Sequence, residues 1–156
     1  MGTEIERKFL LASDEWRTLT EGVLYRQGYL NSDKERTVRV RVIDRQGYLT
    51  VKGACVGNSR QEFEYEIPLQ DAEEMLNELC IKPLIEKKRY TIEYNGCTWE
   101  IDEFLGENSG LIIAEIELES EEQSFDLPAW IGREVSGDPR YFNSNLAENP
   151  YCDWRE

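Results

Sequence analysis

Charged and apolar residues alternate along most of this chain, and this alternation limits the possible folds more than any other feature. Residues 36–43, RTVRVRVI, place valine at every second position from residue 38, with arginine in between. Successive side chains of a β-strand point to opposite faces, so the pattern predicts strands with one apolar and one charged face. Eight segments qualify as strands: 3–11, 24–30, 36–43, 47–53, 60–67, 86–94, 97–105 and 111–119.

Turn and helix signals separate these segments. Asn95-Gly96 is a strong hairpin cue, and residues 44–47 predict a slightly longer turn. Asp71, with Glu74 three residues later, predicts a capped helix start. Many strands and few helices predict an all-β or α+β fold, in which closure into a barrel would remove exposed sheet edges. The expected helices span 71–80, 13–19, 127–133 and 139–147.

The composition predicts one globular domain over residues 1–156. Of the 156 residues, 40% are hydrophobic and 32% are charged, which suits a chain that buries a core of its own. No apolar run approaches the roughly 20 residues of a transmembrane helix, and the N-terminus lacks the apolar core of a signal peptide. We therefore expect a cytoplasmic protein without a membrane partner. The sequence has no dedicated signal for a homodimer.

The chain contains no histidine, and its four cysteines share no CxxC spacing and are expected to be reduced thiols. The lack of histidine excludes a Ser-His-Asp triad and any histidine-liganded zinc site. A bound metal would therefore be a hard cation such as Mg²⁺ or Mn²⁺, held by carboxylates. The net charge of −14 disfavours nucleic acid as a partner, because its phosphate backbone repels an acidic protein.

The charged faces of the predicted strands group like charges together. Glu4 and Glu6 precede Lys8 on one face of the first strand, and Arg39 shares a face of the third strand with Arg41. For one strand alone, a half-buried sheet with a solvated face explains such a row. Like charges at i and i+2 lie roughly 7 Å apart, however, and repel unless opposite charges or an ion face them. The other rows are Lys52; Glu62, Glu64 and Glu66; Lys87 and Arg89; Glu100 and Asp102; and Glu115, Glu117 and Glu119.

A sheet closed around its charged face would satisfy these rows mutually, and such an interior has a specific chemical meaning. Arginine binds phosphate oxygens through its bidentate fork, and lysine binds them as a point charge. Clustered carboxylates hold Mg²⁺ or Mn²⁺, which bridges to the same phosphates. Both kinds of row in one cavity indicate a condensed phosphate bound together with a metal.

The order of the charged motifs resembles that of the CYTH superfamily, also called the triphosphate tunnel metalloenzymes. The opening EIERK, residues 4–8, resembles the family's ExExK motif. Further motifs follow in order along nearly the whole chain: YRQGYL, VRVR, LTVKG, RQEFEYEI, EKKRY, EIDEF, AEIELE and EVSGDPRYFNSNLA. The resemblance implies an α+β, mainly β fold: a closed eight-stranded antiparallel barrel, the tunnel, with a few peripheral helices.

The resemblance also implies the residues of the site. Some relatives carry a lysine near residues 143–145, which read Asn-Ser-Asn here. The residues that match phosphate-binding positions are Lys8, Arg39, Arg41, Lys52, Lys87, Arg89 and Arg140. The residues that match metal ligands are Glu4, Glu6 and Glu117, with Asp102 and Glu115 as further members of the acidic set. Of all these, the expected catalytic residues are Glu4, Glu6, Lys87 and Arg89.

The activity implied is metal-dependent hydrolysis of a triphosphate by direct attack of water, without a phosphoenzyme. The chain resembles small bacterial members that hydrolyse inorganic tripolyphosphate to pyrophosphate and phosphate. Class IV-type adenylate cyclase and thiamine triphosphatase are the alternatives, whereas the acidic balance disfavours RNA triphosphatase. A non-catalytic phosphate-binding module would not need the acidic set. A cyclase needs a nucleoside pocket, for which the candidate stacking residues are Tyr25, Tyr29, Tyr48 and Trp130.

Overall fold

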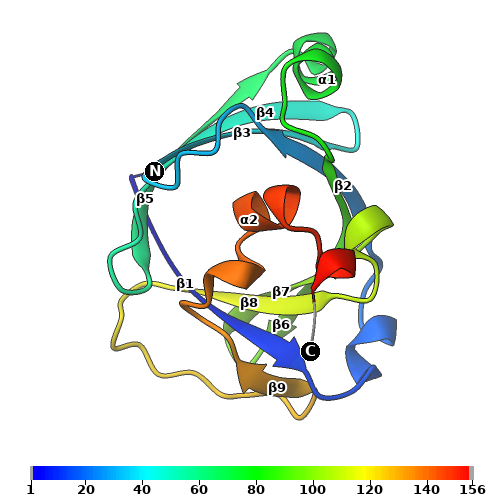
Figure 1. The fold of residues 1–156 in the computed structure, drawn as a ribbon. Coiled ribbons are helices and arrows are strands. Elements are labelled where there is room, and N and C mark those ends of the chain that lie inside the picture. The colour runs from blue at the N-terminus through cyan, green and yellow to red at the C-terminus, as the bar shows by residue number, and fades with distance from the viewer. Residues whose placement is uncertain (1, 155–156) are drawn as a thin grey trace.

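The structure, a computed structural model, describes residues 2–154 and forms a closed antiparallel barrel (Figure 1). Its strands are β1 (Gly2–Leu11), β2 (Val23–Tyr29), β3 (Arg36–Ile43), β4 (Gln46–Gly53), β5 (Ser59–Ile67), β6 (Ile85–Tyr94), β7 (Cys97–Phe104), β8 (Ile112–Leu118) and β9 (Ile131–Glu134). The spatial order is β5-β4-β3-β2-β6-β7-β8-β1, and pairing of β5 with β1 closes the ring. The predicted eight-stranded barrel is confirmed, and each expected strand ends within one residue of the observed one.

The barrel wall separates an apolar exterior from a charged lumen. Trp99 of β7 and Ile116 of β8 are fully buried on the outer side, where they pack in one cluster with Trp16. Val40 and Val42 of β3 pack outside the wall against the helix α1 (Leu69–Glu78), which covers β3 and β4 in Figure 1. Because alternate residues point the other way, the charged residues of the same strands face the lumen.

A third apolar cluster fills one end of the barrel. The helix α2 (Asn143–Glu148) lies within the ring of strands (Figure 1). Its Leu146 and Ala147 pack with Ile85, Phe104 and Ile113 from the inner face of the wall. We call α2 the plug helix, and it confines the charged residues to the other part of the lumen.

The strand β9 replaces a predicted helix. The sequence predicts a helix at 127–133, and this prediction is wrong because residues 131–134 pair with the second half of β1. The partner strand β5 reaches only the first half of β1, from Gly2 to Ile5. The backbone of β1 beyond this point needs another hydrogen-bonding partner, and β9 provides it. Tertiary pairing therefore decides the structure of this short segment.

The helix ends show one further difference from the prediction. The helix α1 begins at Leu69 after Pro68, without a side-chain cap, so the predicted capping by Asp71 is wrong. Asn95 and Gly96 both have positive φ, which confirms the tight hairpin.

Among residues 2–154, no helix is long and apolar enough to cross a membrane. The remaining short helices are η1 (Glu15–Thr18), η2 (Gly106–Asn108), η3 (Pro139–Tyr141) and η4 (Tyr151–Asp153), of which η1 and η3 with α2 were expected.

Candidate active site

A cavity of about 240 Å³ occupies the charged part of the lumen. Its basic residues are largely withdrawn from water, since Lys87 is 1% exposed and Arg39 is 6% exposed. Burying charges on this scale is unfavourable unless each one is paired or meets a ligand. The predicted site residues that line the cavity are Glu4, Glu6, Lys8, Arg39, Arg41, Lys52, Lys87, Arg89, Glu115 and Glu117.

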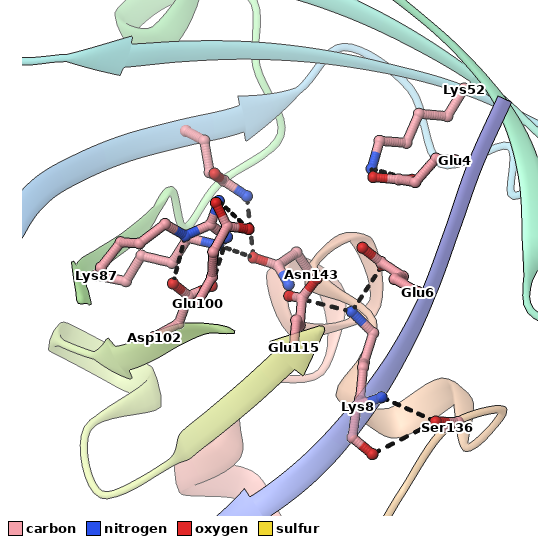
Figure 2. A network of polar contacts seen from close by, with 12 residues as sticks. Glu4, Glu6, Lys8, Lys52, Lys87, Glu100, Asp102, Glu115, Ser136 and Asn143 are labelled. Carbon is pink, nitrogen blue, oxygen red and sulfur yellow. Dashed lines mark hydrogen bonds and ion pairs between the residues drawn. The ribbon is translucent and has the colours of Figure 1, made fainter. Parts of the chain in front are cut away.

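Lys8 lies between two carboxylates on the acidic side of the cavity (Figure 2). Its Nζ is 3.2 Å from Glu6 Oε1 and 3.3 Å from Glu115 Oε1. Burial acts to lower the pKa of Lys8, but the two carboxylates outweigh it and raise this pKa well above its ordinary value. Lys8 therefore carries its positive charge throughout the neutral range and ties β1 to β8.

Glu117 marks the part of the lumen with the most negative charge. It lies directly opposite Glu6 in the register of β8 and β1, where like charges repel. Burial raises the pKa of Glu117, and the carboxylates of Glu4, Glu6, Glu62 and Glu100 raise it further. We call the group formed by Glu4, Glu6 and Glu117 the acidic corner. A cation is electrostatically favoured there.

Arg39 and Arg41 of β3 point into the cavity and are only partly satisfied by protein partners. Arg39 lies 3.5 Å from Glu64, but its buried Nε has no hydrogen-bond partner among the described residues. Arg41 donates from Nε to Gln27 Oε1 at 2.8 Å and forms no ion pair with any residue from 2 to 154. Burial, with repulsion from Arg39 and Arg89, lowers the pKa of Arg41 to about 9. Both guanidinium groups are therefore set up to receive an anion.

Asp102 lies beneath Lys87 and Arg89 of β6, which we call the basic wall, and does not line the cavity. Its Oδ2 is 2.7 Å from Lys87 Nζ, and its Oδ1 is 2.7 Å from Arg89 Nε. Burial opposes the charge of Asp102, but Arg89 and Lys87 hold its pKa far below the ordinary value. Burial lowers the pKa of the Lys87 ammonium, and Arg89 and Arg41 add to this effect while Asp102 opposes it. The sequence predicts Asp102 among the metal ligands. In the structure, the side chains of Lys87 and Arg89 bind both of its oxygens.

Asn143 joins the plug helix to the basic wall. Lys87 Nζ donates to Asn143 Oδ1 at 2.8 Å, and Gln27 Nε2 donates to the same oxygen at 3.0 Å (Figure 2). Phe142 and Ser144 on either side of it also line the cavity. Where some relatives carry a lysine, this chain therefore has the amide oxygen of Asn143, which orients Lys87.

Arg140 is not brought together with the other predicted site residues. Its side chain is 52% exposed, and its Nη2 lies 2.9 Å from Asp138 Oδ2. The guanidinium also contacts the rings of Tyr141 and Trp154. Arg140 does not line the cavity, although the resemblance places it among the phosphate-binding residues.

Several lining residues lie outside the predicted phosphate and metal ligands, although Glu62, Glu64 and Glu100 belong to the charged rows of the sequence. Arg60 and Glu62 alternate on β5 and so share the inner face with one another. Lys52 is opposite Glu62 in the strand register, and its Nζ lies 3.3 Å from Glu62 Oε2 and 3.0 Å from Glu4 Oε1. The full set of additional lining residues is Tyr29, Thr37, Cys55, Arg60, Glu62, Glu64, Glu100, Phe142, Asn143 and Ser144.

The acidic corner fits a divalent cation in charge and ligand chemistry. Carboxylate oxygens are the ligands that Mg²⁺ and Mn²⁺ prefer. Burial raises the pKa of Glu115, and the neighbouring Glu6 carboxylate raises it further. Within the described residues, no three carboxylates converge into a ready-made metal site. Glu6 is paired with Lys8 instead, and Glu4 is paired with Lys52.

Comparison with known proteins gives the same family throughout. Residues 2–149 match the CYTH domain. The chain is 60% identical over 156 residues to the inorganic triphosphatase of Acetivibrio thermocellus, covering all of both chains. It is 39% identical over 152 residues to the inorganic triphosphatase of Nitrosomonas europaea, covering 93% of this chain and 97% of that one. The crystal structure of the inorganic triphosphatase NE1496 has a TM-score of 0.68 at 37% identity, covering 94% and 95% of the two chains. With its barrel, its charged lumen and its plug helix all inside the matched range, this chain belongs to the CYTH domain family.

Proposed function

We propose that this protein is a metal-dependent inorganic triphosphatase that hydrolyses tripolyphosphate to pyrophosphate and phosphate. One observation carries the proposal: the cavity places Arg39, whose Nε has no described hydrogen-bond partner, and Arg41, which has no ion pair among the described residues, in the same lumen as the acidic corner. Such an arrangement suits an anion of high charge that binds with a divalent cation. The names of the relatives at 60% and 39% identity support the same reaction.

The cavity favours a substrate without an organic group. Among the described residues, its aromatic lining consists of Tyr29 and Phe142, and Tyr29 is only 4% exposed. Tyr25 holds two arginines against its ring, and Trp130 is buried in the outer core. Tyr29, Tyr25 and Trp130 offer no open stacking surface for adenine or thiamine, and Phe142 is the half-buried aromatic side chain of the lining. The observations therefore support tripolyphosphate over the substrates of an adenylate cyclase or a thiamine triphosphatase.

The basic residues would bind the phosphate chain and stabilise the charge that develops during hydrolysis. In phosphoryl transfer this charge spreads over the equatorial and leaving oxygens. Fixed cations in a site that excludes water stabilise it without reorganisation at the moment of reaction. Lys87 and Arg89, which Asp102 anchors, are proposed to act on the oxygens nearest the reacting phosphorus. The other proposed phosphate ligands are Lys8, Arg39, Arg41 and Lys52.

We propose Mg²⁺ or Mn²⁺ as the cofactor, held by Glu4, Glu6 and Glu117 with Glu115 close by. A divalent cation at this place would neutralise phosphate charge and lower the pKa of a water molecule for attack on phosphorus. The raised pKa of Glu117 expresses the repulsion that such a cation would relieve. No histidine, and no nucleophilic serine or cysteine paired with a base, is needed for this reaction, since water is the attacking group.

The test is phosphate release from tripolyphosphate, ATP and thiamine triphosphate, measured in parallel with Mg²⁺, Mn²⁺ or EDTA. We expect fast, metal-dependent release from tripolyphosphate and much slower release from ATP. Formation of cyclic AMP and pyrophosphate would establish a cyclase instead. Binding of tripolyphosphate without turnover would establish a phosphate-binding module. Glu4→Gln and Glu6→Gln variants further separate an enzyme from a binding module, because an enzyme loses turnover on these changes, whereas the substrate affinity of a binding module changes little.

We also propose a cytoplasmic location and no nucleic-acid partner. The net charge of −14 opposes association with a phosphate backbone, and the basic residues of the site lie inside the lumen rather than on an approach surface. A homodimer remains a prediction, and light scattering on the purified protein in solution tests it directly.

A further inference from the structure

The ring of Tyr25 contacts two of the cavity's arginines from different strands. The Cζ atoms of Arg41 and Arg89 each lie 4.9 Å from the centroid of the Tyr25 ring. In the strand register, Tyr25 of β2 is opposite Ile43 of β3 and Lys87 of β6. Arg41 and Arg89 are each two residues away from those partners, on the same inner face. Tyr25 is therefore the residue at which the basic rows of β3 and β6 meet.

The two arginines differ in how firmly the rest of the protein holds them. Arg89 is fixed by Asp102 through two hydrogen bonds of 2.7 and 2.8 Å, and by Glu100 at 3.2 Å. Arg41 has the single hydrogen bond to Gln27 and no ion pair in the described part of the chain. Arg39 and Arg89 both repel the Arg41 guanidinium, so its position is electrostatically unfavourable unless another contact holds it.

We propose that Tyr25 is a positioning residue that holds Arg41 beside Arg89 and aims both at the triphosphate. The inference rests on the proposed function, whose phosphate ligands include both arginines. The negative face of an aromatic ring attracts guanidinium groups, most strongly where water is excluded. Because Tyr25 does not line the cavity, it acts through the arginines rather than on the substrate. A cation held in place beforehand loses less freedom when the anion binds, which increases affinity.

The test replaces Tyr25 with phenylalanine and with phenylalanines carrying one, two and three ring fluorines. Fluorine withdraws electrons from the ring and weakens its attraction for cations, while the ring's size and apolar character change little. The Kd of tripolyphosphate is measured by calorimetry in EDTA, and KM and kcat are measured in Mg²⁺. A cation–π contact of ordinary strength is worth a factor of about 2 to 30 in affinity.

We expect the Tyr25→Phe variant to bind like the wild type, because no described residue hydrogen-bonds the Tyr25 hydroxyl. Across the fluorinated series we expect Kd and KM to rise at each step, by about fivefold in total, with kcat nearly constant. The same series at Tyr65, which is 61% exposed on the outside of β5, should leave both constants unchanged. Thermal melts of every variant verify that the fold is retained.

A flat series at position 25, with wild-type protein that binds tripolyphosphate normally, would show that Tyr25 only fills space and would overturn the inference alone. Wild-type protein that neither binds nor hydrolyses tripolyphosphate would overturn the proposed function, and the inference with it. A loss of kcat without any change in Kd would also contradict a role in positioning phosphate ligands.

Discussion

Lys87 and Asp102 form a fully buried ion pair, with 2.7 Å between Nζ and Oδ2 and only 1% of each side chain exposed. The carboxylate serves two cations at once, since Arg89 engages both of its oxygens. The contacts of Asp102 therefore fix the positions of Lys87 and Arg89 in the cavity. It also makes Asp102 the residue whose loss leaves the most uncompensated charge in the lumen.

Replacing Asp102 with asparagine should lower the free energy of unfolding by about 3–5 kcal/mol, because it leaves two buried cations without their partner. Urea unfolding at pH 7 measures the change, and Asp14→Asn is a matched control, since Asp14 is 77% exposed. The pKa of Asp102 is depressed in the folded state, so its contribution is complete above the ordinary aspartate pKa and is lost as pH falls. The difference in stability between the two proteins should therefore begin to shrink only below about pH 4 and persist in part down to much lower pH. Equal stability at pH 7 would contradict the assigned role.

Replacing Arg39 with lysine should reduce kcat/KM for tripolyphosphate by about tenfold or more, because a hydrogen bond to a charged group is worth about 1.5–3 kcal/mol. Lysine retains the charge but has no atom equivalent to the unpaired Nε. Steady-state kinetics with Mg²⁺ provides the measurement. Arg36→Lys on the same strand, where the side chain is 82% exposed, should have no effect. Unchanged kinetics for both variants would remove Arg39 from the phosphate ligands.

Replacing Glu117 with glutamine should stabilise the metal-free protein while reducing activity. The pKa of Glu117 is raised in the folded state, so its charge opposes folding above that pKa, and the penalty disappears as the pH falls below the ordinary glutamate pKa. Glu117 is exposed, so water screens part of this repulsion. We expect Tm at pH 7 to rise by about 1–2 °C at most, with no difference below about pH 4. Activity should fall at least about tenfold.

Mg²⁺ provides an independent check on Glu117. It should raise the Tm of the wild type more than that of the Glu117→Gln variant, because the variant lacks one proposed ligand. Glu73→Gln on the exposed side of α1 is the control for the loss of one negative charge. An equal response of all three proteins to Mg²⁺ would exclude Glu117 from the metal site.

Replacing Asn143 with alanine should loosen the plug helix and weaken substrate binding. The change removes the oxygen that accepts from Lys87 and Gln27, so the Lys87 ammonium loses one of its two fixed partners. We expect KM to rise by about three- to tenfold and amide exchange in residues 143–148 to become faster. Asn149→Ala, just beyond the end of α2, should change neither quantity. Faster exchange with an unaltered KM would limit Asn143 to a structural role.

Alternation was sufficient to predict the eight barrel strands because a barrel wall imposes it on every strand. Arg39 and Val40 must face opposite sides wherever the strand lies. The same rule could not predict β9, whose four residues carry no alternation of charge. Its structure depends on the unpaired second half of β1, which a single sequence does not reveal.

The side that a residue faces could be predicted, but its depth in the lumen could not. Glu100 and Asp102 alternate on β7 in the same way, yet Glu100 lines the cavity and Asp102 is buried beneath it. The difference arises from the apolar plug, which fills the end of the barrel nearer to Asp102 and Phe104. For Arg140 even the side could not be predicted, because it lies outside the strands and alternation gives no direction for its side chain.

The pairing of β1 with β8 determines when the site comes into existence during synthesis. Glu6 meets Glu117 only after residue 118 has left the ribosome, because β1 pairs with β8, which is formed much later in the chain. Until then, the acidic and basic rows are open to water, where their charges are well solvated and bind phosphate weakly. A chain in which β1 has not yet paired with β8 therefore lacks the acidic corner.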